Sequence, residues 1–333
     1  MSKLQDKTPA WWYGDSAPPA HARLLAALYG AVVALRRKLF HAGLLRSHRV
    51  AAPVIVVGNV SVGGTGKTPL TIALVERLRA EGWRPGVASR GYGRRDEGKA
   101  MWIDSRTAPA DGGDEPVLIA RRTGVRVRAD RDRTAAAREL IAAGCDVIVC
   151  DDGLQHLALS RDLEVCIFNE QGVGNGFLLP AGPLREPWPR AVDFVLHAGT
   201  LPPGSDPAHA YGLQRRLAPY ALRADGTRVP LSDLQGQPLH AVAAVARPEV
   251  FFAMLQAEAL QLAHTEALPD HYDFDSWNRS SDKRHPLICT EKDAVKLWQH
   301  HPDALAVPLQ LHIDPAFFAA LDARLLALGV QRH

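Results

Sequence analysis

The sequence predicts an α/β protein: a mostly parallel sheet covered by helices, followed by a second, smaller α/β unit. Apolar runs typical of buried strands alternate with helical segments from Val54 to about Gly199, and this alternation is typical of a parallel sheet with helices on both faces. A glycine-rich loop, 58–68, separates the first apolar run from a helix, so it would lie at the carboxyl edge of the sheet, where ligands collect. From about Thr200 the chain becomes rich in proline and glycine, which indicates a hinge.

We expect four parts along the chain. Residues 1–50 form a basic, amphipathic helical region, 51–205 the domain with the glycine loop, 206–238 a linker that alternates like an antiparallel ribbon, and 239–333 the smaller α/β domain. At 333 residues, 47% of them hydrophobic, the chain is long enough for two cores.

Charge and cysteine content narrow the function classes. The net charge is only +3 and the basic residues form neither a long tail nor a dense stripe, so we expect no nucleic-acid partner. The four cysteines form no CxxC pair, which argues against a zinc site and indicates buried thiols in a reducing compartment. The amino terminus lacks the basic start and apolar core of an export signal.

The amino-terminal region combines an apolar helix with positive charge. No acidic residue stands between Asp15 and Glu76, and one predicted helical face carries apolar residues at helical spacing: Leu24, Leu28, Val32, Leu35 and Leu39. The apolar run is shorter than the roughly 20 residues that cross a bilayer. Two interpretations stay open: the helix packs on its own domain, or it lies on an anionic membrane surface, which the aromatic run 11–13 just upstream also suits.

The glycine loop indicates a phosphate site. In the pattern G-x-x-x-x-G-K-[ST], backbone amides hold phosphates, the lysine reaches the terminal ones and the hydroxyl binds Mg²⁺. Gly66, Lys67 and Thr68 match it, whereas Ser61 stands at the first glycine position. The sequence therefore predicts a P-loop NTPase-like domain, with a plain glycine turn as the alternative. The expected nucleotide-binding residues are Ser61, Val62, Gly63, Gly64, Thr65, Gly66, Lys67 and Thr68.

A second apolar strand ends in two acidic residues, Asp151 and Asp152. A strand that delivers a carboxylate to Mg²⁺ beside the loop is what a Walker B position needs. Adjacent residues on a strand point to opposite faces, so both would reach the metal only if the strand end bends. The alternative is a polar strand end without a ligand.

Val62 bears on the class of P-loop protein. Partition and cell-division-site ATPases carry a lysine at this place and use it across a dimer interface, so valine argues against a dimeric sorting ATPase. A P-loop kinase that acts on a small molecule in solution is a further alternative, and the amino-terminal helix argues against it.

Seven motifs, in order, resemble the tetraacyldisaccharide 4′-kinase family, which phosphorylates the lipid A precursor. They are "GNVSVGGTGKTP", "SRGYGR", "GDEP", "DDGLQH", "GNGFLLPAGPLRE", "PDHY" and "TEKDAVK", and they run from about Pro53 to Lys296. The resemblance implies transfer of the ATP γ-phosphoryl group to the 4′-hydroxyl of a tetraacylated glucosamine disaccharide 1-phosphate, with Mg²⁺, at the cytoplasmic face of the inner membrane. It also implies two α/β domains that close over the nucleotide around a two-stranded linker. We infer no obligate protein partner.

The resemblance also implies roles for single residues. Lys67 would neutralise phosphate oxygens, and Thr68 would bind Mg²⁺ with Asp151 or Asp152. Asp114 of "GDEP" and His271 of "PDHY" would form a catalytic pair from different domains, in which the carboxylate accepts the hydroxyl proton and the histidine tunes or relays it.

Further residues of these motifs are expected around the cleft. Glu186 is a candidate for the metal or substrate shell, or else a plain ion partner of Arg185. The remaining cleft candidates are Asn59, Arg90, Gln155 and His156. In "TEKDAVK", the charged run 291–293 either caps a helix or contacts the nucleotide when the domains close.

Overall fold

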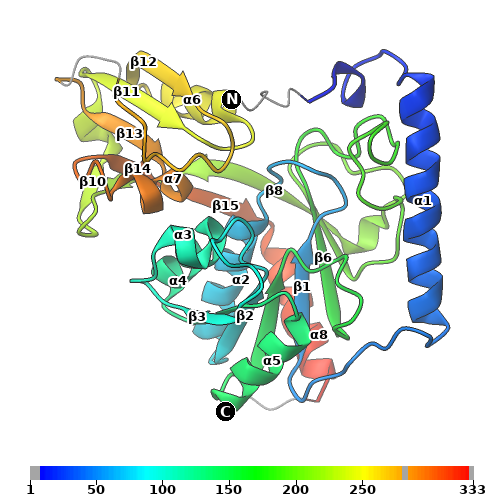
Figure 1. Ribbon diagram of the computed structural model, residues 1–333. Helices are drawn as coiled ribbons and strands as arrows, with labels where there is room; N and C mark the ends of the chain where they lie inside the picture. The colour runs from blue at the N-terminus through cyan, green and yellow to red at the C-terminus, as the bar shows by residue number, and fades with distance from the viewer. Residues whose placement is uncertain (1–7, 280–283, 330–333) are drawn as a thin grey trace.

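The computed structural model describes residues 8–279 and 284–329, which form two sheets flanked by helices (Figure 1). Within these residues the larger sheet has nine strands in the order β15-β8-β7-β6-β1-β5-β2-β4-β3, and the smaller has six in the order β10-β9-β14-β13-β11-β12. The strands are β1 Val54–Gly58, β2 Pro85–Ser89, β3 Met101–Ile103, β4 Arg126–Ala129, β5 Val147–Asp151, β6 Leu163–Phe168, β7 Phe194–His197, β8 Ala210–Leu217, β9 Tyr220–Leu222, β10 Arg228–Pro230, β11 Pro238–Ala243, β12 Gln261–Ala267, β13 Leu287–Thr290, β14 Leu305–Val307 and β15 Leu309–Ile313. The α-helices are α1 Ala20–His41, α2 Lys67–Ala80, α3 Pro109–Gly112, α4 Asp114–Thr123, α5 Arg133–Ala142, α6 Pro248–Ala257, α7 Glu291–Leu297 and α8 Pro315–Ala327, and the 3₁₀ helices are η1 Ala10–Trp12, η2 Pro207–His209 and η3 Leu231–Leu234.

The larger sheet is parallel from β8 through β4, and its two edge strands, β3 and β15, are antiparallel to their neighbours. Its central strands β1, β5 and β6 are buried along their whole length because both faces of the sheet are covered. Apolar residues of α2, α4 and α8 pack on one face, and those of α5 and of the segment 154–192 on the other. This arrangement confirms the predicted fold class.

The order of the strands places the glycine loop at a switch point. β1 lies between β5 and β6. From β1 the sheet extends to one edge through β5, β2, β4 and β3, and to the other edge through β6, β7, β8 and β15. Ligand sites of open α/β sheets form at the carboxyl ends of strands at such a point. The loop 59–66 leaves β1 there and leads directly into α2.

The smaller sheet has a parallel core, β12-β11-β13-β14, with the antiparallel hairpin β9-β10 at one edge. Its two faces carry separate apolar clusters, one with Phe251 and Leu255 of α6 and one with Ala294 and Leu297 of α7. The hairpin turns at Gly226, as the sequence indicates.

At the carboxyl end, the observed boundary between the two units differs from the expected domain boundary. β15 pairs antiparallel with β8 in the larger sheet, and Phe317, Leu321 and Leu325 of α8 join the larger core. The range 239–333 therefore extends too far for the smaller unit. Within 206–238, β9 and β10 form the expected antiparallel ribbon, whereas β8 pairs with β15. The chain thus crosses between the units twice, after β8 and before β15 (Figure 1).

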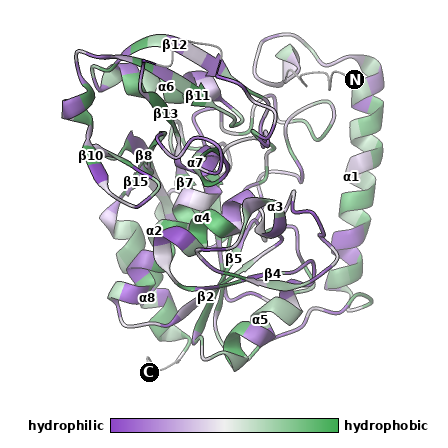
Figure 2. Ribbon diagram, turned by 60° about the vertical axis from the view of Figure 1, so that its left-hand side comes forward, coloured by the Kyte–Doolittle hydropathy of each residue, from purple (hydrophilic) through white to green (hydrophobic). Residues whose placement is uncertain are grey.

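Helix α1 stands at one side of the molecule (Figures 1 and 2), and several of its large apolar residues are exposed. Leu24 and Val32 are each 65% exposed, and Leu28 and Leu35 each 58%. The apolar contact of α1 with the protein is made by small residues: Ala22 and Ala26 pack against Ala181 and Leu178. Among the described helices, none is both long enough and apolar enough to span a bilayer.

The aromatic run before α1 is attached to the protein. Trp12 donates its indole N–H to the carbonyl of Pro180, and Asn175 donates its amide N–H to Trp12 and its side-chain N–H to Trp11. Trp11, Trp12 and Tyr13 are each half-buried in this contact. The segment therefore fixes one end of α1 to the larger unit.

The placement of α8 generates a stability prediction. Phe317 is 0% exposed and makes edge-to-face ring contacts with Phe194 and Tyr211. We expect Phe317→Ala to lower the free energy of unfolding by about 3–5 kcal/mol in urea denaturation, because it leaves a cavity in the larger core. Leu326→Ala, at a position that is 57% exposed, is the control and should change stability by less than about 0.5 kcal/mol. A loss below about 1 kcal/mol for Phe317→Ala would contradict the assignment of α8 to this core.

Candidate active site

The glycine loop has the backbone geometry of an anion site. Gly63 and Gly66 have φ of 102° and 94°, a region that favours glycine. Helix α2 begins at Lys67 with Gly66 as its cap residue and without a hydrogen bond from a capping side chain. Its first N–H groups are therefore available to a phosphate, which the positive end of the helix dipole also favours.

Neighbouring segments fix the loop from outside. The amide N–H of Val62 donates to the carbonyl of Pro183 at 2.9 Å, and the guanidinium of Arg215 donates to the carbonyl of Thr65 at 2.7 Å. Arg215 comes from β8, the strand that leads to the smaller unit. The sequence offered no signal for this contact, because Arg215 belongs to no motif.

Lys67 lies among the acidic and amide groups of the site. Its Nζ is 3.3 Å from Oδ1 of Asn59 and 3.9 Å from Oδ1 of Asp152. Burial lowers the pKa of Lys67, and the charge of Asp152 opposes that effect. Asn59 is fully buried at the end of β1.

The two acidic residues at the end of β5 both turn toward the loop and α2. Asp152 has φ of 50°, so the strand ends in a bend. Such a bend is what two adjacent carboxylates need in order to approach one metal ion. Asp151 is buried and accepts a hydrogen bond of 2.8 Å from the hydroxyl of Thr71 on α2. Burial raises the pKa of Asp151 to about 6, whereas the charges of Lys67 and Arg185 overcome burial and hold the pKa of Asp152 below its usual range.

Arg185 is a site residue that sequence reasoning assigned only as an ion partner of Glu186. Its two terminal nitrogens lie 2.8 and 3.2 Å from the two carboxylate oxygens of Asp152, and one of them also donates to the carbonyl of Asn59 at 2.9 Å. It contacts the side-chain oxygen of Asn59 as well. Its place in the motif "PLRE" was the signal that could have identified it.

Glu186 lies in a cluster of arginines behind this contact. Its carboxylate is 3.2 Å from Arg190 and 3.8 Å from Arg37 of α1, and it accepts a hydrogen bond of 2.6 Å from Gln155. Gln155 also donates to the backbone carbonyl of Asn59 at 3.0 Å. Metal binding by Glu186 stays a prediction. The ion pairs would compete with a metal ion, because both use the same carboxylate oxygens.

The other two cleft candidates differ in environment. His156 is half-buried, and burial lowers its pKa to about 4, so its imidazole is neutral near pH 7. Arg90 is half-exposed on the loop after β2 and lies 3.9 Å from Glu97. The predicted roles of His156 and Arg90 in substrate binding stay predictions.

Asp114 and His271 meet, although they are 157 residues apart. Asp114 is the first residue of α4 and is 5% exposed, and its Oδ2 lies 3.0 Å from Nδ1 of His271. His271 has φ of 63°, an unusual conformation for a residue with a side chain. Its amide donates to the carbonyl of Ala244 at the end of β11, and its ring packs edge-on against Tyr92.

Two lysines of α7 contact this pair. The sequence left Lys292 between helix capping and a nucleotide contact and assigned no role to Lys296. Lys296 is 2.8 Å from Oδ2 of Asp114 and donates to the carbonyls of His271 and Tyr272. Lys292 is 3.3 Å from Nε2 of His271. Their motif, "TEKDAVK", was a sufficient signal of importance, but the cross-unit contacts required the fold.

Opposite pKa shifts follow from this arrangement. The hydrogen bond with Asp114 raises the pKa of His271, against the effects of burial and of the charge of Lys292. Burial would raise the pKa of Asp114, but the contacts with His271 and Lys296 outweigh it, so the pKa of Asp114 is lowered. The imidazole is therefore the more basic member of the pair.

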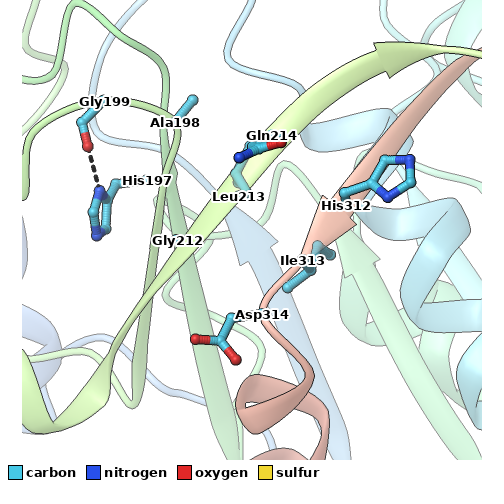
Figure 3. A pocket seen from close by; sticks show the side chains of 9 residues that line it. All are labelled: His197, Ala198, Gly199, Gly212, Leu213, Gln214, His312, Ile313 and Asp314. Atoms are coloured by element: carbon cyan, nitrogen blue, oxygen red, sulfur yellow. Dashed lines mark hydrogen bonds between the residues drawn. The ribbon is translucent and has the colours of Figure 1, made fainter.

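Two other features lie outside this site. A cavity of about 530 Å³ is lined by ends of β7, β8 and β15, with His197, Gln214, His312 and Asp314 among its residues (Figure 3). Within the described part of the chain, His240, His264 and Glu266 of the smaller sheet have ligand atoms within 4.8 Å of one another. The charge of Arg279 acts on His240 there, which opposes a bound cation.

A strand, a glycine loop that opens a helix, and a buried acidic strand end together define a P-loop nucleotide-binding enzyme. A family model described as tetraacyldisaccharide-1-P 4′-kinase matches residues 20–326. A tetraacyldisaccharide 4′-kinase of Acidovorax sp. (strain JS42) is 61% identical over 100% of this chain and 98% of its own length, and one of Verminephrobacter eiseniae is 62% identical over 96% and 75%. The chain belongs to the tetraacyldisaccharide 4′-kinase family, which confirms the resemblance.

A solved structure agrees. The crystal structure described as LpxK from Aquifex aeolicus in complex with ATP has a TM-score of 0.78 and 26% identity, and the match covers 91% of this chain and 98% of that one. The likeness therefore extends over both units.

The position of Lys67 generates a prediction on activity. We expect Lys67→Ala to lower kcat/KM by about 10²–10³-fold, because an ammonium group beside the phosphates stabilises charge in the transition state. Steady-state kinetics measure the loss, and an unchanged melting temperature shows that the fold is intact. The exposed Lys99→Ala is the control. A loss of less than about tenfold would remove Lys67 from the phosphate site.

Proposed function

We propose that the chain binds Mg·ATP at Ser61–Thr68 and transfers the γ-phosphoryl group to the 4′-hydroxyl of a tetraacylated glucosamine disaccharide 1-phosphate, with Asp114 and His271 handling the hydroxyl proton. Its family membership makes it an ATP-dependent 4′-kinase of lipid A synthesis. The observation that carries the proposed chemistry is the 3.0 Å contact between Asp114 and His271. Burial is the main cause of the pKa shifts of Lys67 and Asp151. The charge of Glu115, the residue after Asp114, also acts on both groups.

Positive charge around the loop fits the phosphates of ATP. Lys67 and the amides at the start of α2 would bind the β- and γ-phosphate oxygens. Arg185 pairs closely with Asp152, so Lys67, which lies 3.9 Å from the same carboxylate, could turn to the phosphates without leaving Asp152 unpaired. Phosphoryl transfer depends mainly on such placement of charge, because the protein forms no bond to the group transferred.

The residues present fit a magnesium ion. Thr68, Asp151 and Asp152 offer oxygen donors, which Mg²⁺ prefers. The buried carboxylate of Asp151 has a raised pKa, and a divalent cation would favour its ionised form. When bound, Mg²⁺ supplies charge neutralisation between the β- and γ-phosphates.

The proton of the 4′-hydroxyl would pass to Nε2 of His271, since Nδ1 faces Asp114. The oxygen–phosphorus bond forms as the bond to the β-phosphate oxygen breaks, and ADP leaves with that electron pair. Asp114 would orient the imidazole and stabilise its protonated form. The sequence left the order of proton transfer within this pair open. The contacts with His271 and Lys296 lower the pKa of Asp114, which favours the imidazole as the proton acceptor.

The test of the function is transfer of labelled phosphate. Purified enzyme is incubated with [γ-³²P]ATP, Mg²⁺ and the acylated disaccharide 1-phosphate in detergent micelles. Supporting the proposal requires a doubly phosphorylated lipid that depends on all three additions. ATP hydrolysis without labelled lipid would contradict it.

We expect Asp114→Ala and His271→Ala each to lower kcat/KM by about 10²–10⁴-fold, the usual contribution of acid–base catalysis. In the wild type, activity should fall as the pH drops through the raised pKa of His271, because the protonated imidazole cannot accept the proton. Asp111→Ala, on a partly exposed residue three positions before Asp114, is the matched control. Activity of Asp114→Ala within about tenfold of wild type would remove the residue from the proton-transfer pair.

A separate proposal concerns location: α1 holds the protein on the cytoplasmic face of the inner membrane. The exposed leucines and Val32 would enter the acyl boundary, and the exposed cations Arg23, Lys38, Arg46 and Arg49 would approach anionic headgroups. Arg36 and Arg37 of the same helix contact Gln155 and Glu186, so the membrane-facing helix adjoins the candidate site. An acylated substrate could then reach the cleft without leaving the bilayer.

The double substitution Leu28→Glu and Val32→Glu should weaken sedimentation with vesicles that contain phosphatidylglycerol by at least about tenfold, because two charges enter the apolar face. Turnover of a short-chain, water-soluble acceptor should stay near wild type. Leu326→Glu, on the exposed end of α8, is the control. Unchanged sedimentation of the double variant would overturn the role of α1.

A further inference from the structure

Lys292 is placed where it can decide which nitrogen of His271 carries a proton. It is the second residue of α7, and its side chain is 21% exposed. Its Nζ lies 3.0 Å from Oε1 of Glu115, 3.2 Å from Oδ1 of Asp270 and 3.3 Å from Nε2 of His271. The three donors of one ammonium group thus have three partners, one of them on the larger unit.

The chemistry of these contacts fixes the direction of the hydrogen bonds. An ammonium group has three donors and no acceptor, so Nε2 of His271 must accept. Burial would lower the pKa of Lys292, but the charges of Glu115 and Asp270 outweigh it, so the pKa is raised and the group stays charged. With Nε2 as acceptor, the single proton of the neutral ring resides on Nδ1, which donates to Asp114 at 3.0 Å.

We propose that Lys292 is a positioning residue, which holds His271 in the neutral form protonated at Nδ1 and so keeps Nε2 ready to accept a proton. This inference rests on the proposed role of His271 and adds the means by which the smaller unit prepares it. When the sugar hydroxyl arrives, it takes the place of Lys292 at Nε2. Glu115 and Asp270 then keep the ammonium beside the ring.

The charges around His271 set the sign of the effect. Asp114 and Glu115 of α4 and Asp270 on its own loop favour the protonated ring, whereas Lys292 of α7 disfavours it. Lys296 pairs with Asp114, and the ring of Tyr92 covers one side of the imidazole. Without Lys292, three carboxylates would face His271 with one cation among them, so its protonated form would persist to higher pH.

The first experiment reads the ring directly. Nitrogen-15 NMR of histidine side chains in the full-length protein without nucleotide, with His271→Ala to assign the signal, should show Nε2 unprotonated and Nδ1 protonated in the wild type at a pH just above the raised pKa of His271. In Lys292→Met the same signal should show both nitrogens protonated at that pH. A wild-type spectrum with the proton on Nε2 would overturn the proposal without reference to activity.

The second experiment measures kcat/KM against pH. For Lys292→Met we expect a loss of at least about tenfold near pH 6.5 and recovery to within about threefold of wild type near pH 9, because the acidic limb moves to higher pH. Lys292→Arg restores a cation and should return the limb toward its wild-type place. Lys99→Met, on an exposed lysine, should change neither limb.

The outcomes separate the two proposals. A uniform loss at every pH in Lys292→Met, with a normal melting temperature, would show a structural contact only and would overturn the positioning role. Wild-type activity in His271→Ala would overturn the base assignment, while the NMR result would still decide whether Lys292 sets the protonation of the ring.

Discussion

The hydrogen bond between Asp114 and His271 is the contact on which the arrangement of the two units depends. One partner opens a helix of the larger unit, and the other lies beside the carboxyl end of β11 in the smaller sheet. Oppositely charged residues of α4 and α7 surround this hydrogen bond. Glu115 pairs with Lys292, and Asp114 pairs with Lys296. Arg122 of α4 pairs with Glu291 of α7 at 2.7 Å. Because these pairs are partly buried, each loses much of its hydration and depends on its partner for compensation. The relative position of α4 and α7 is thereby narrowly defined.

The same requirement governs the phosphate loop. Asp151 and Asp152 are adjacent, and two neighbouring carboxylates are costly without positive charge. Asp152 obtains it from Arg185 and Lys67, whereas Asp151 accepts a hydrogen bond from the hydroxyl of Thr71 and keeps a raised pKa because it is buried. The protein thus neutralises the charge of Asp152, whereas the carboxylate of Asp151 is placed to interact with a bound ligand.

Much of the fold could be predicted because its signals are local. The strand–loop–helix at 54–80 and the acidic end of β5 are continuous in sequence, and the apolar alternation specifies a parallel sheet. The ends of the chain were harder, since the pattern of β15 suits the edge of either sheet and only the complete core shows that Phe317 belongs to the larger one. At the site, motifs identified Asp114 and His271, but Arg185, Arg215 and Lys292 act through contacts between segments far apart in sequence.

The two passages of the chain between the units make the smaller one an insertion within the larger. The last strand and helix of the chain, β15 and α8, complete the larger sheet and one of its faces. During synthesis the ribosome therefore releases the final wall of the nucleotide-binding unit after the whole inserted unit has emerged. In the described part of the chain, both passages run through the antiparallel pair β8 and β15, so one two-stranded ribbon carries the covalent connection in each direction.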